Sequence, residues 1–134
     1  MRILLSYNAN DAWLTEALCA NLCMLGPDLH FTLSPAPCTQ RSRHNPTAVD
    51  IREFDSLILV VGPNGLSAQQ KDEWNTANQL SAQDGKFVVL PVAAGSALPP
   101  KGINLGTREW FELPVVTDRK AVRALIQILK SCKL

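Results

Sequence analysis

The chain of 134 residues has almost no excess of either charge, with 13 basic and 12 acidic side chains. A balance so close to zero does not predict the basic surface that attracts nucleic acid or an anionic membrane. The first apolar run, Ile3–Leu5, is too short for a signal peptide, and no later run is long enough to span a bilayer. We therefore expect a cytoplasmic protein without a nucleic-acid or membrane partner.

Cysteine is scarce, and its four copies lack the tight regular spacing of a disulfide framework, which favours reduced thiols. Cys19 and Cys23 share one face of a predicted helix, at a spacing that suits a metal. No histidine or acidic partner accompanies them in sequence, so we expect inert thiols rather than a metal site. Apolar residues, in contrast, make up 46% of the chain, enough for the core of a single domain over residues 1–134.

Strand and helix patterns alternate along the first third of the chain. Ile3–Ser6 is a short apolar run typical of a strand, and Asn10 offers a helix N-cap. The helix that follows ends at Gly26-Pro27, and its apolar positions recur at helical spacing at Leu14, Ala17, Leu18, Leu22 and Leu25. His30–Leu33 is predicted as a second strand. Ser34–Pro46 is predicted as a long loop, followed by a brief helix through Ala48, Val49 and Ile51.

Leu57–Val61 and Phe87–Val92 are continuous apolar runs, typical of central strands covered on both faces by helices. Between them, Ser67 and Gln70 form a capping box that opens a helix. Gly95–Gly106 is predicted as loop and Trp110–Leu113 as an edge strand. The last helix is expected to begin near Thr117 and to bury Val122, Leu125, Ile126 and Leu129.

These elements predict an α/β flavodoxin-like three-layer sandwich: a five-stranded parallel sheet of order 2-1-3-4-5, with helices on both faces and right-handed crossovers. Open sheets of this kind bind ligands at the carboxyl ends of their strands, where the helices begin. Glu73 lies a short way inside the helix that follows Leu57–Val61 and the turn Gly62–Gly65. That position makes Glu73 the leading candidate for chemistry.

Several segments resemble the bacterial type of Toll/interleukin-1 receptor (TIR) domain. Ile3-Leu4-Leu5-Ser6-Tyr7, followed by Asp11 and Trp13, resembles the first box of that family. Residues 59–66, with Glu73 and Ala77 after them, are similar to its strand, glycine-containing turn and helix that lead to a glutamate. Residues 89–92 resemble the next strand, and Trp110 stands where the family often has an aromatic residue.

The resemblance implies cleavage of the nicotinamide–ribose bond of NAD⁺, with the glutamate matching Glu73 as the essential residue. NAD⁺ is then the substrate, and the product is ADP-ribose or a cyclic relative. The resemblance implies no metal and no bound cofactor. The resemblance further implies activation by oligomerisation with other TIR domains and a sensor domain or protein, in a bacterial immune or cell-death system. Its candidate substrate contacts in this chain are Ser6, Tyr7, Asn8, Ser34, Arg41 and Trp74.

The family usually has a tryptophan four residues before the glutamate, where this chain has Gln69. The nearby tryptophan, Trp74, aligns with Ala77 and Ser81 on the predicted buried stripe of the helix, which favours core packing over substrate stacking. Tyr7 is then a candidate substitute for stacking. The alternative function is a weak or inactive TIR scaffold that acts through TIR–TIR contacts.

Overall fold

The computed structural model describes residues 2–34, 51–95, 111–113 and 115–131, and its centre is a five-stranded sheet. The strands are β1 (Arg2–Ser6), β2 (His30–Ser34), β3 (Ser56–Val61), β4 (Val88–Ala94) and β5 (Phe111–Leu113). They lie in the order β2-β1-β3-β4-β5, and every pair is parallel. The predicted fold class and strand order are confirmed.

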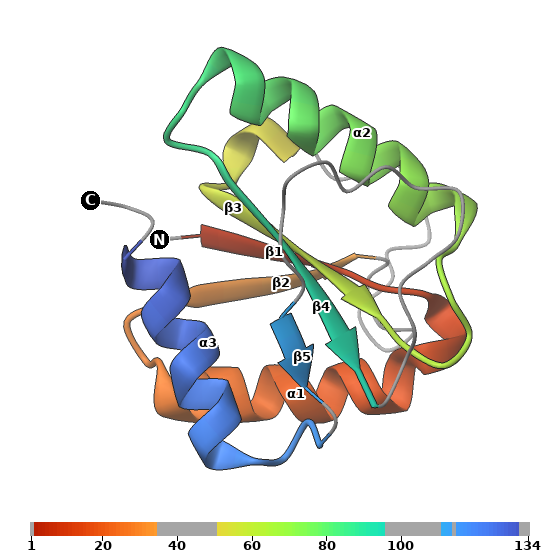
Figure 1. Ribbon diagram of the computed structural model, residues 1–134, viewed down its shortest axis with the longest axis vertical. Helices are drawn as coiled ribbons and strands as arrows, with labels where there is room; N and C mark the ends of the chain where they lie inside the picture. The colour runs from red at the N-terminus through yellow and green to blue at the C-terminus, as the bar shows by residue number, and fades with distance from the viewer. Residues whose placement is uncertain (1, 35–50, 96–110, 114, 132–134) are drawn as a thin grey trace, which may run out of the picture.

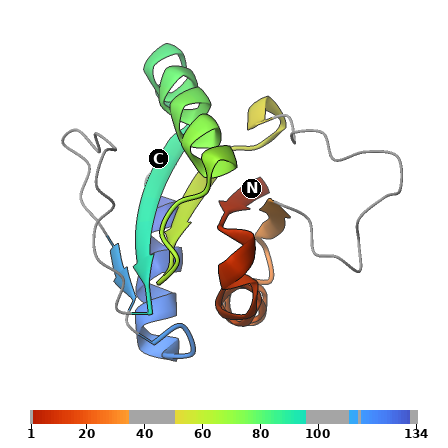
Figure 2. The ribbon, with the colours of Figure 1, turned by 90° about the vertical axis from the view of Figure 1, so that its right-hand side faces the viewer.

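Helices cover both faces of this sheet, as Figures 1 and 2 show. α1 (Ala12–Leu25) and α3 (Arg119–Ser131) lie on one face and contact each other. α2 (Ala68–Gln83) crosses the other face, together with the short 3₁₀ helix η3 (Ile51–Glu53). The first turns of α2 lie above the carboxyl ends of β1 and β2, at the right of Figure 1. The arrangement is therefore three-layered.

The face beneath α1 and α3 is the larger apolar core. Alternation along β1 sends Ile3, Leu5 and Tyr7 to this face, where they meet buried residues of both helices. The helical contribution comes from Leu14, Leu18, Leu22, Val122, Leu125, Ile126 and Leu129. Burying one such leucine fully contributes about 1.5–3 kcal/mol to folding. The four residues predicted as the buried stripe of the last helix are all in this core.

The face beneath α2 is more mixed. A smaller apolar cluster joins Leu4, Leu57 and Leu59 of the sheet to Trp74 and Ala77 of α2, and Ile51, Phe54, Phe87 and Val89 complete it toward the amino ends of the strands. At the carboxyl ends the same face also holds buried polar residues, beside Val61 of the apolar cluster. The candidate site lies in that polar part.

The helix boundaries differ from the prediction in two places. A 3₁₀ turn, η1 (Ala9–Asp11), precedes α1, so Asn10 is not its N-cap. Asn8 caps the turn instead, because its Oδ1 accepts a hydrogen bond from the Asn10 N–H at 3.0 Å. α3 begins at Arg119, two residues beyond Thr117. The Gly26 end of α1 and the capping box of Ser67 with Gln70 are confirmed.

Other predicted boundaries shift slightly or lie beyond the described residues. Ser34 is the last residue of β2, although the sequence places it in the loop. Ile51 belongs to η3, while Ala48 and Val49 lie outside the described residues. Trp110 also lies outside, and β5 keeps the last three residues of the predicted edge strand.

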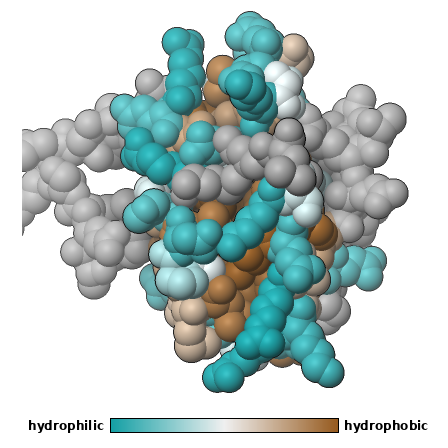
Figure 3. Space-filling model, turned by 90° about the vertical axis from the view of Figure 1, so that its left-hand side faces the viewer, coloured by the Kyte–Doolittle hydropathy of each residue, from teal (hydrophilic) through white to brown (hydrophobic). Residues whose placement is uncertain are grey.

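The described helices are all too short or too polar to cross a bilayer. On the side that carries the amino end of β1, apolar and hydrophilic side chains alternate across the surface in bands (Figure 3).

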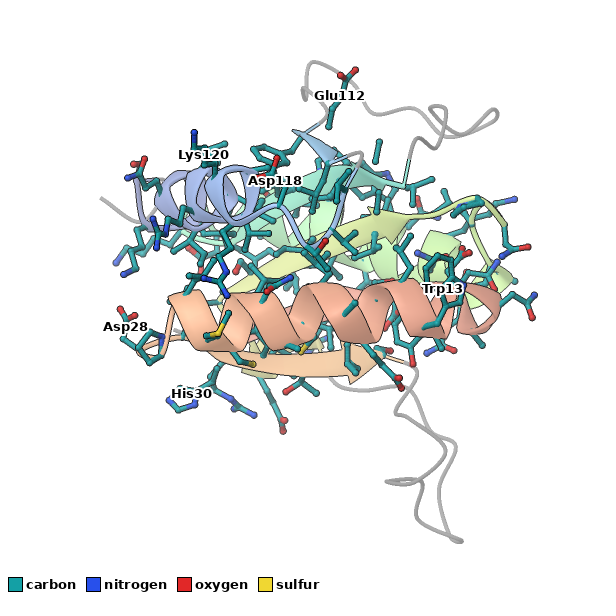
Figure 4. The ribbon with its side chains drawn as sticks, turned by 90° about the horizontal axis from the view of Figure 1, so that it is seen from below. Trp13, Asp28, His30, Glu112, Asp118 and Lys120 are labelled. Atoms are coloured by element: carbon teal, nitrogen blue, oxygen red, sulfur yellow. The ribbon has the colours of Figure 1, made fainter. Side chains whose placement is uncertain are left out.

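Trp13, 68% exposed, stands on the outer surface of the first turn of α1 (Figure 4). It takes no part in the apolar cores.

Candidate functional site

Glu73 is the only acidic residue of α2 that is buried, with 5% of its surface exposed. It is the sixth residue of the helix, so it lies between one and two turns from the N-terminus. The capping box fixes that terminus, since Ser67 Oγ accepts from the Gln70 N–H and Gln70 Oε1 accepts from the Ser67 N–H. The local sequence therefore sets where along the helix the carboxylate falls.

Two strand-end hydroxyls hold the carboxylate of Glu73. Ser6, the last residue of β1, donates to Oε1 at 2.8 Å, and Ser34, the last residue of β2, donates to Oε2 at 2.6 Å. Both serines are fully buried, and the register of the parallel strands pairs them side by side. One carboxylate thus bridges the carboxyl ends of two neighbouring strands.

The pKa of Glu73 is raised above the ordinary glutamate value, chiefly because burial disfavours the charged form. The Ser34 and Ser6 hydrogen bonds act in the opposite direction and lower the pKa, since both hydroxyls donate to the anion. The negative charge of Asp72 raises it further. Glu73 is therefore a shielded carboxyl group whose two hydroxyl partners favour its ionised form.

Two glutamines of α2 complete this network. Gln69 Nε2 donates to Ser34 Oγ at 3.0 Å. Gln70 Nε2 donates to the main-chain carbonyls of Ser6 at 3.1 Å and Val60 at 2.7 Å, at the ends of β1 and β3. Gln70 is fully buried, so these bonds satisfy an amide that burial would otherwise penalise. α2 is therefore joined to the carboxyl ends of three strands.

A second polar cluster joins the turn after β1 to the turn after β3. Asp11 is 1% exposed, and its Oδ1 accepts from Asn64 Nδ2 at 2.6 Å. Asn8 Nδ2 donates to the carbonyl of Asn64 at 3.3 Å. Gly62 lies so close that a Cβ on it would stand 2.6 Å from Asp11 Cγ. The turn Gly62–Gly65 is thus tied to Asp11.

The candidate substrate contacts predicted from sequence separate into groups. Ser6 and Ser34 contact Glu73 directly, whereas Asn8 belongs to the second cluster. Tyr7 follows Ser6 along the strand, so it faces the opposite side of the sheet and packs, 2% exposed, in the core beneath α1. This position, on the face of the sheet opposite Glu73, argues against the stacking role for which the sequence made Tyr7 a candidate.

Trp74 is 3% exposed and belongs to the apolar cluster beneath α2. Its position supports the core-packing interpretation that its helical spacing favoured. Arg41 lies outside the described residues, so its predicted contact stays a prediction.

Sequence reasoning identified Ser6, Ser34 and Glu73 but missed the contacts of Gln69, Gln70 and Asn64. Gln70 carried a signal only for its capping role, and its bonds to two strand ends depend on the tertiary placement of α2. Gln69 appeared only as a departure from the family pattern. Its contact with Ser34, 35 residues earlier, has no local signal in the sequence.

The Sγ atoms of Cys19 and Cys23 are 4.0 Å apart on α1. Burial and the neighbouring Cys23 raise the pKa of the Cys19 thiol to about 12. The thiol is therefore a weak nucleophile at neutral pH, in line with the inert role expected for it. Across the ranges that the structure describes, no three histidine, cysteine or acidic side chains are grouped to hold a metal ion.

Comparisons of the chain with protein-family models, with curated proteins and with solved structures each return no match.

Proposed function

We propose that this chain is a cytoplasmic TIR-type domain that hydrolyses the nicotinamide–ribose bond of NAD⁺, with Glu73 as the catalytic residue. The observation that carries the proposal is the burial of Glu73 at the carboxyl ends of β1 and β2, where two hydroxyls hold its carboxylate. The resemblance of residues 3–7 and 59–73 to the TIR family supplies the substrate. Other TIR domains and a sensor are the proposed partners.

The chemistry needs one anion and no general acid. When the C1′–N1 bond breaks, its electron pair moves to the pyridinium nitrogen, and nicotinamide leaves as a neutral molecule. The ribose becomes an oxocarbenium ion, and the carboxylate of Glu73 stabilises that positive charge in a site of low dielectric constant. A water molecule then forms the new bond to C1′ and releases one proton. The products are ADP-ribose, nicotinamide and a proton.

The hydrogen bonds of Glu73 suit this role. Both carboxylate oxygens accept from hydroxyls, which favours the ionised form, and each oxygen keeps a further lone pair for a ribose hydroxyl. Because Ser6 and Ser34 are anchored in strands, the carboxylate is positioned before substrate arrives. Preorganisation of this kind is what makes electrostatic stabilisation effective.

The test is turnover of a fluorescent NAD⁺ analogue at high protein concentration with a crowding agent, comparing wild type with Glu73→Gln. The substitution keeps the size of the side chain and removes its charge. We expect turnover to fall by about 10²–10³-fold, the usual cost of losing one preorganised group.

Asp72→Asn is the matched control, because it removes the same charge from the adjacent, exposed position. We expect its turnover to stay within about twofold of wild type. Undiminished turnover in Glu73→Gln excludes Glu73 as the catalytic residue. Wild-type protein without any turnover favours the scaffold alternative, to which the buried Trp74 and the presence of Gln69 in the family's tryptophan position also point.

A further inference from the structure

Gln69, Ser34 and Glu73 form a chain of hydrogen bonds with a defined direction. Ser34 has one hydroxyl hydrogen, and the 2.6 Å contact directs it to Glu73 Oε2. Ser34 Oγ can then only accept from Gln69, whose amide nitrogen lies 3.0 Å away. A hydroxyl that accepts one hydrogen bond donates the next more strongly. With Glu73 ionised, the Ser34 hydroxyl both donates and accepts, and both oxygens of Glu73 have a donor.

The direction of the hydrogen bonds between Gln69, Ser34 and Glu73 must reverse if Glu73 takes up a proton on Oε2. The carboxylic acid then donates to Ser34 Oγ, and the Ser34 hydrogen needs another acceptor. Turning the Gln69 amide by 180° presents Oε1 in place of Nε2 and supplies that acceptor. Gln69 is exposed on the first turn of α2, so the amide has room to turn.

We propose that Gln69 is a positioning residue whose amide, acting through Ser34 Oγ, keeps the carboxyl group of Glu73 hydrogen-bonded in both its ionised and its protonated forms. A side chain that only donates, or only accepts, can serve one of the two forms. Gln69 and Glu73 stand four residues apart on one face of α2, so both reach the same residue of β2.

Among the described residues, few other charges lie near Glu73. Ser6 and Ser34 face it from the sheet and are neutral, and within α2 the charge that acts on it is that of the neighbouring Asp72. Arg52 and Glu53 of η3 are exposed and lie toward the amino end of β1, where Arg2 Nη1 donates to the Glu53 carbonyl. The substitution of Gln69 therefore changes the hydrogen-bond partner of Ser34 in an otherwise constant setting.

The experiment measures the titration of Glu73 directly, by carbon-13 NMR of its side-chain carboxyl, in Gln69→Lys and Gln69→Glu. Lysine only donates, so the midpoint should move to lower pH, whereas an ionised glutamate only accepts, so the midpoint should move to higher pH. We expect the two midpoints to differ by about one pH unit or more. Gln79→Lys and Gln79→Glu are controls on the same helix, exposed and about 15 Å further along its axis.

A second pair of measurements separates the hydrogen-bond chain from simple charge effects. In a Ser34→Ala background the chain is cut, while the charge at position 69 still acts through space. We expect the difference between the Glu73 titration midpoints of Gln69→Lys and Gln69→Glu to fall by at least about half in that background. An unchanged difference in the Ser34→Ala background, or midpoints that do not separate at all, overturns the proposal.

The catalytic consequence rests on the proposed function, whereas the NMR titration does not. If NAD⁺ is hydrolysed, the acid limb of kcat/KM should follow the NMR midpoint in each variant. If wild type shows no turnover but the midpoints separate as expected, the proposed function fails and the role of Gln69 stands. Turnover without separated midpoints overturns the role of Gln69 and leaves the proposed function standing.

Discussion

The two ends of the sheet differ in whether their buried serines have hydrogen-bond partners. Three fully buried serines stand at strand ends: Ser6 and Ser34 at carboxyl ends and Ser56 at the amino end of β3. The first two donate to Glu73, whereas Ser56 Oγ is the one buried side-chain oxygen or nitrogen without a partner in the described part of the chain. Near the amino ends, Ile51, Phe54 and Phe87 pack around α2 instead.

This difference indicates that the fold accommodates buried polar groups at the carboxyl ends of the strands. At the carboxyl ends α2 begins, and its first two turns bring Gln69, Gln70 and Glu73 to the strands. Within the described ranges, each buried side-chain oxygen or nitrogen at this end has a partner, so the cost of burying it is reduced. Trp74 and Ala77, which follow Glu73 along the same helix, belong to the apolar cluster instead. The helix therefore contributes both buried polar contacts with the strand ends and apolar contacts to this face.

The largest expected effect in this comparison concerns two glycines at opposite ends. A Cβ on Gly62, at the carboxyl end of β3, would stand 2.6 Å from the Asp11 carboxyl carbon, whereas a Cβ on Gly85, before β4, meets nothing within 4 Å. We expect Gly62→Ala to lower the free energy of unfolding by about 2 kcal/mol, because the crowded Asp11 must move. Gly85→Ala should change it by less than about 1 kcal/mol. Urea unfolding measures both, and equal effects contradict the crowding at Asp11.

A smaller effect is expected for the serines, with opposite signs at the two ends. Ser6→Ala removes a donor from a buried carboxylate and should destabilise the fold by about 1.5 kcal/mol at pH 8. Ser56→Ala removes a buried hydroxyl that lacks a partner, so it should leave stability unchanged or raise it by up to about 1 kcal/mol. Chemical denaturation of the two variants side by side decides this. A loss in Ser56→Ala as large as that in Ser6→Ala would refute the contrast between the ends.

The smallest expected effect is the pH dependence that Glu73 contributes to stability. Because its pKa in the folded protein is raised, the unfolded chain ionises first, and stability falls as pH rises from the ordinary glutamate pKa through the folded value. Glu73→Gln does not lose stability in this way, because glutamine does not ionise. We expect the Tm of Glu73→Gln to exceed that of wild type by up to about 3 °C at pH 8. The gap should shrink as pH falls toward 4, and calorimetry at several pH values follows it; a gap that widens at low pH contradicts the sign.

Much of the fold follows from local patterns. The continuous apolar runs at 57–61 and 87–92 became the central strands, and the periodic positions Val122, Leu125, Ile126 and Leu129 became the buried face of α3. Ser67 and Gln70 capped α2 as predicted. The start of α1 was the exception, because a 3₁₀ turn with Asn8 as its cap competes locally with the expected cap at Asn10.

Some properties of the candidate site follow from the sequence, and others follow only from the tertiary structure, for a physical reason. The sequence by itself determined that Glu73 lies on the second turn of a capped helix, since capping and periodicity act over a few residues. Only the tertiary structure decided its partners, because Ser6 and Ser34 stand 67 and 39 residues away and meet it through strand register. Alternation along β1 places Tyr7 on the face opposite Ser6, and only the packing of α1 and α2 on the two faces decides which of these residues meets Glu73.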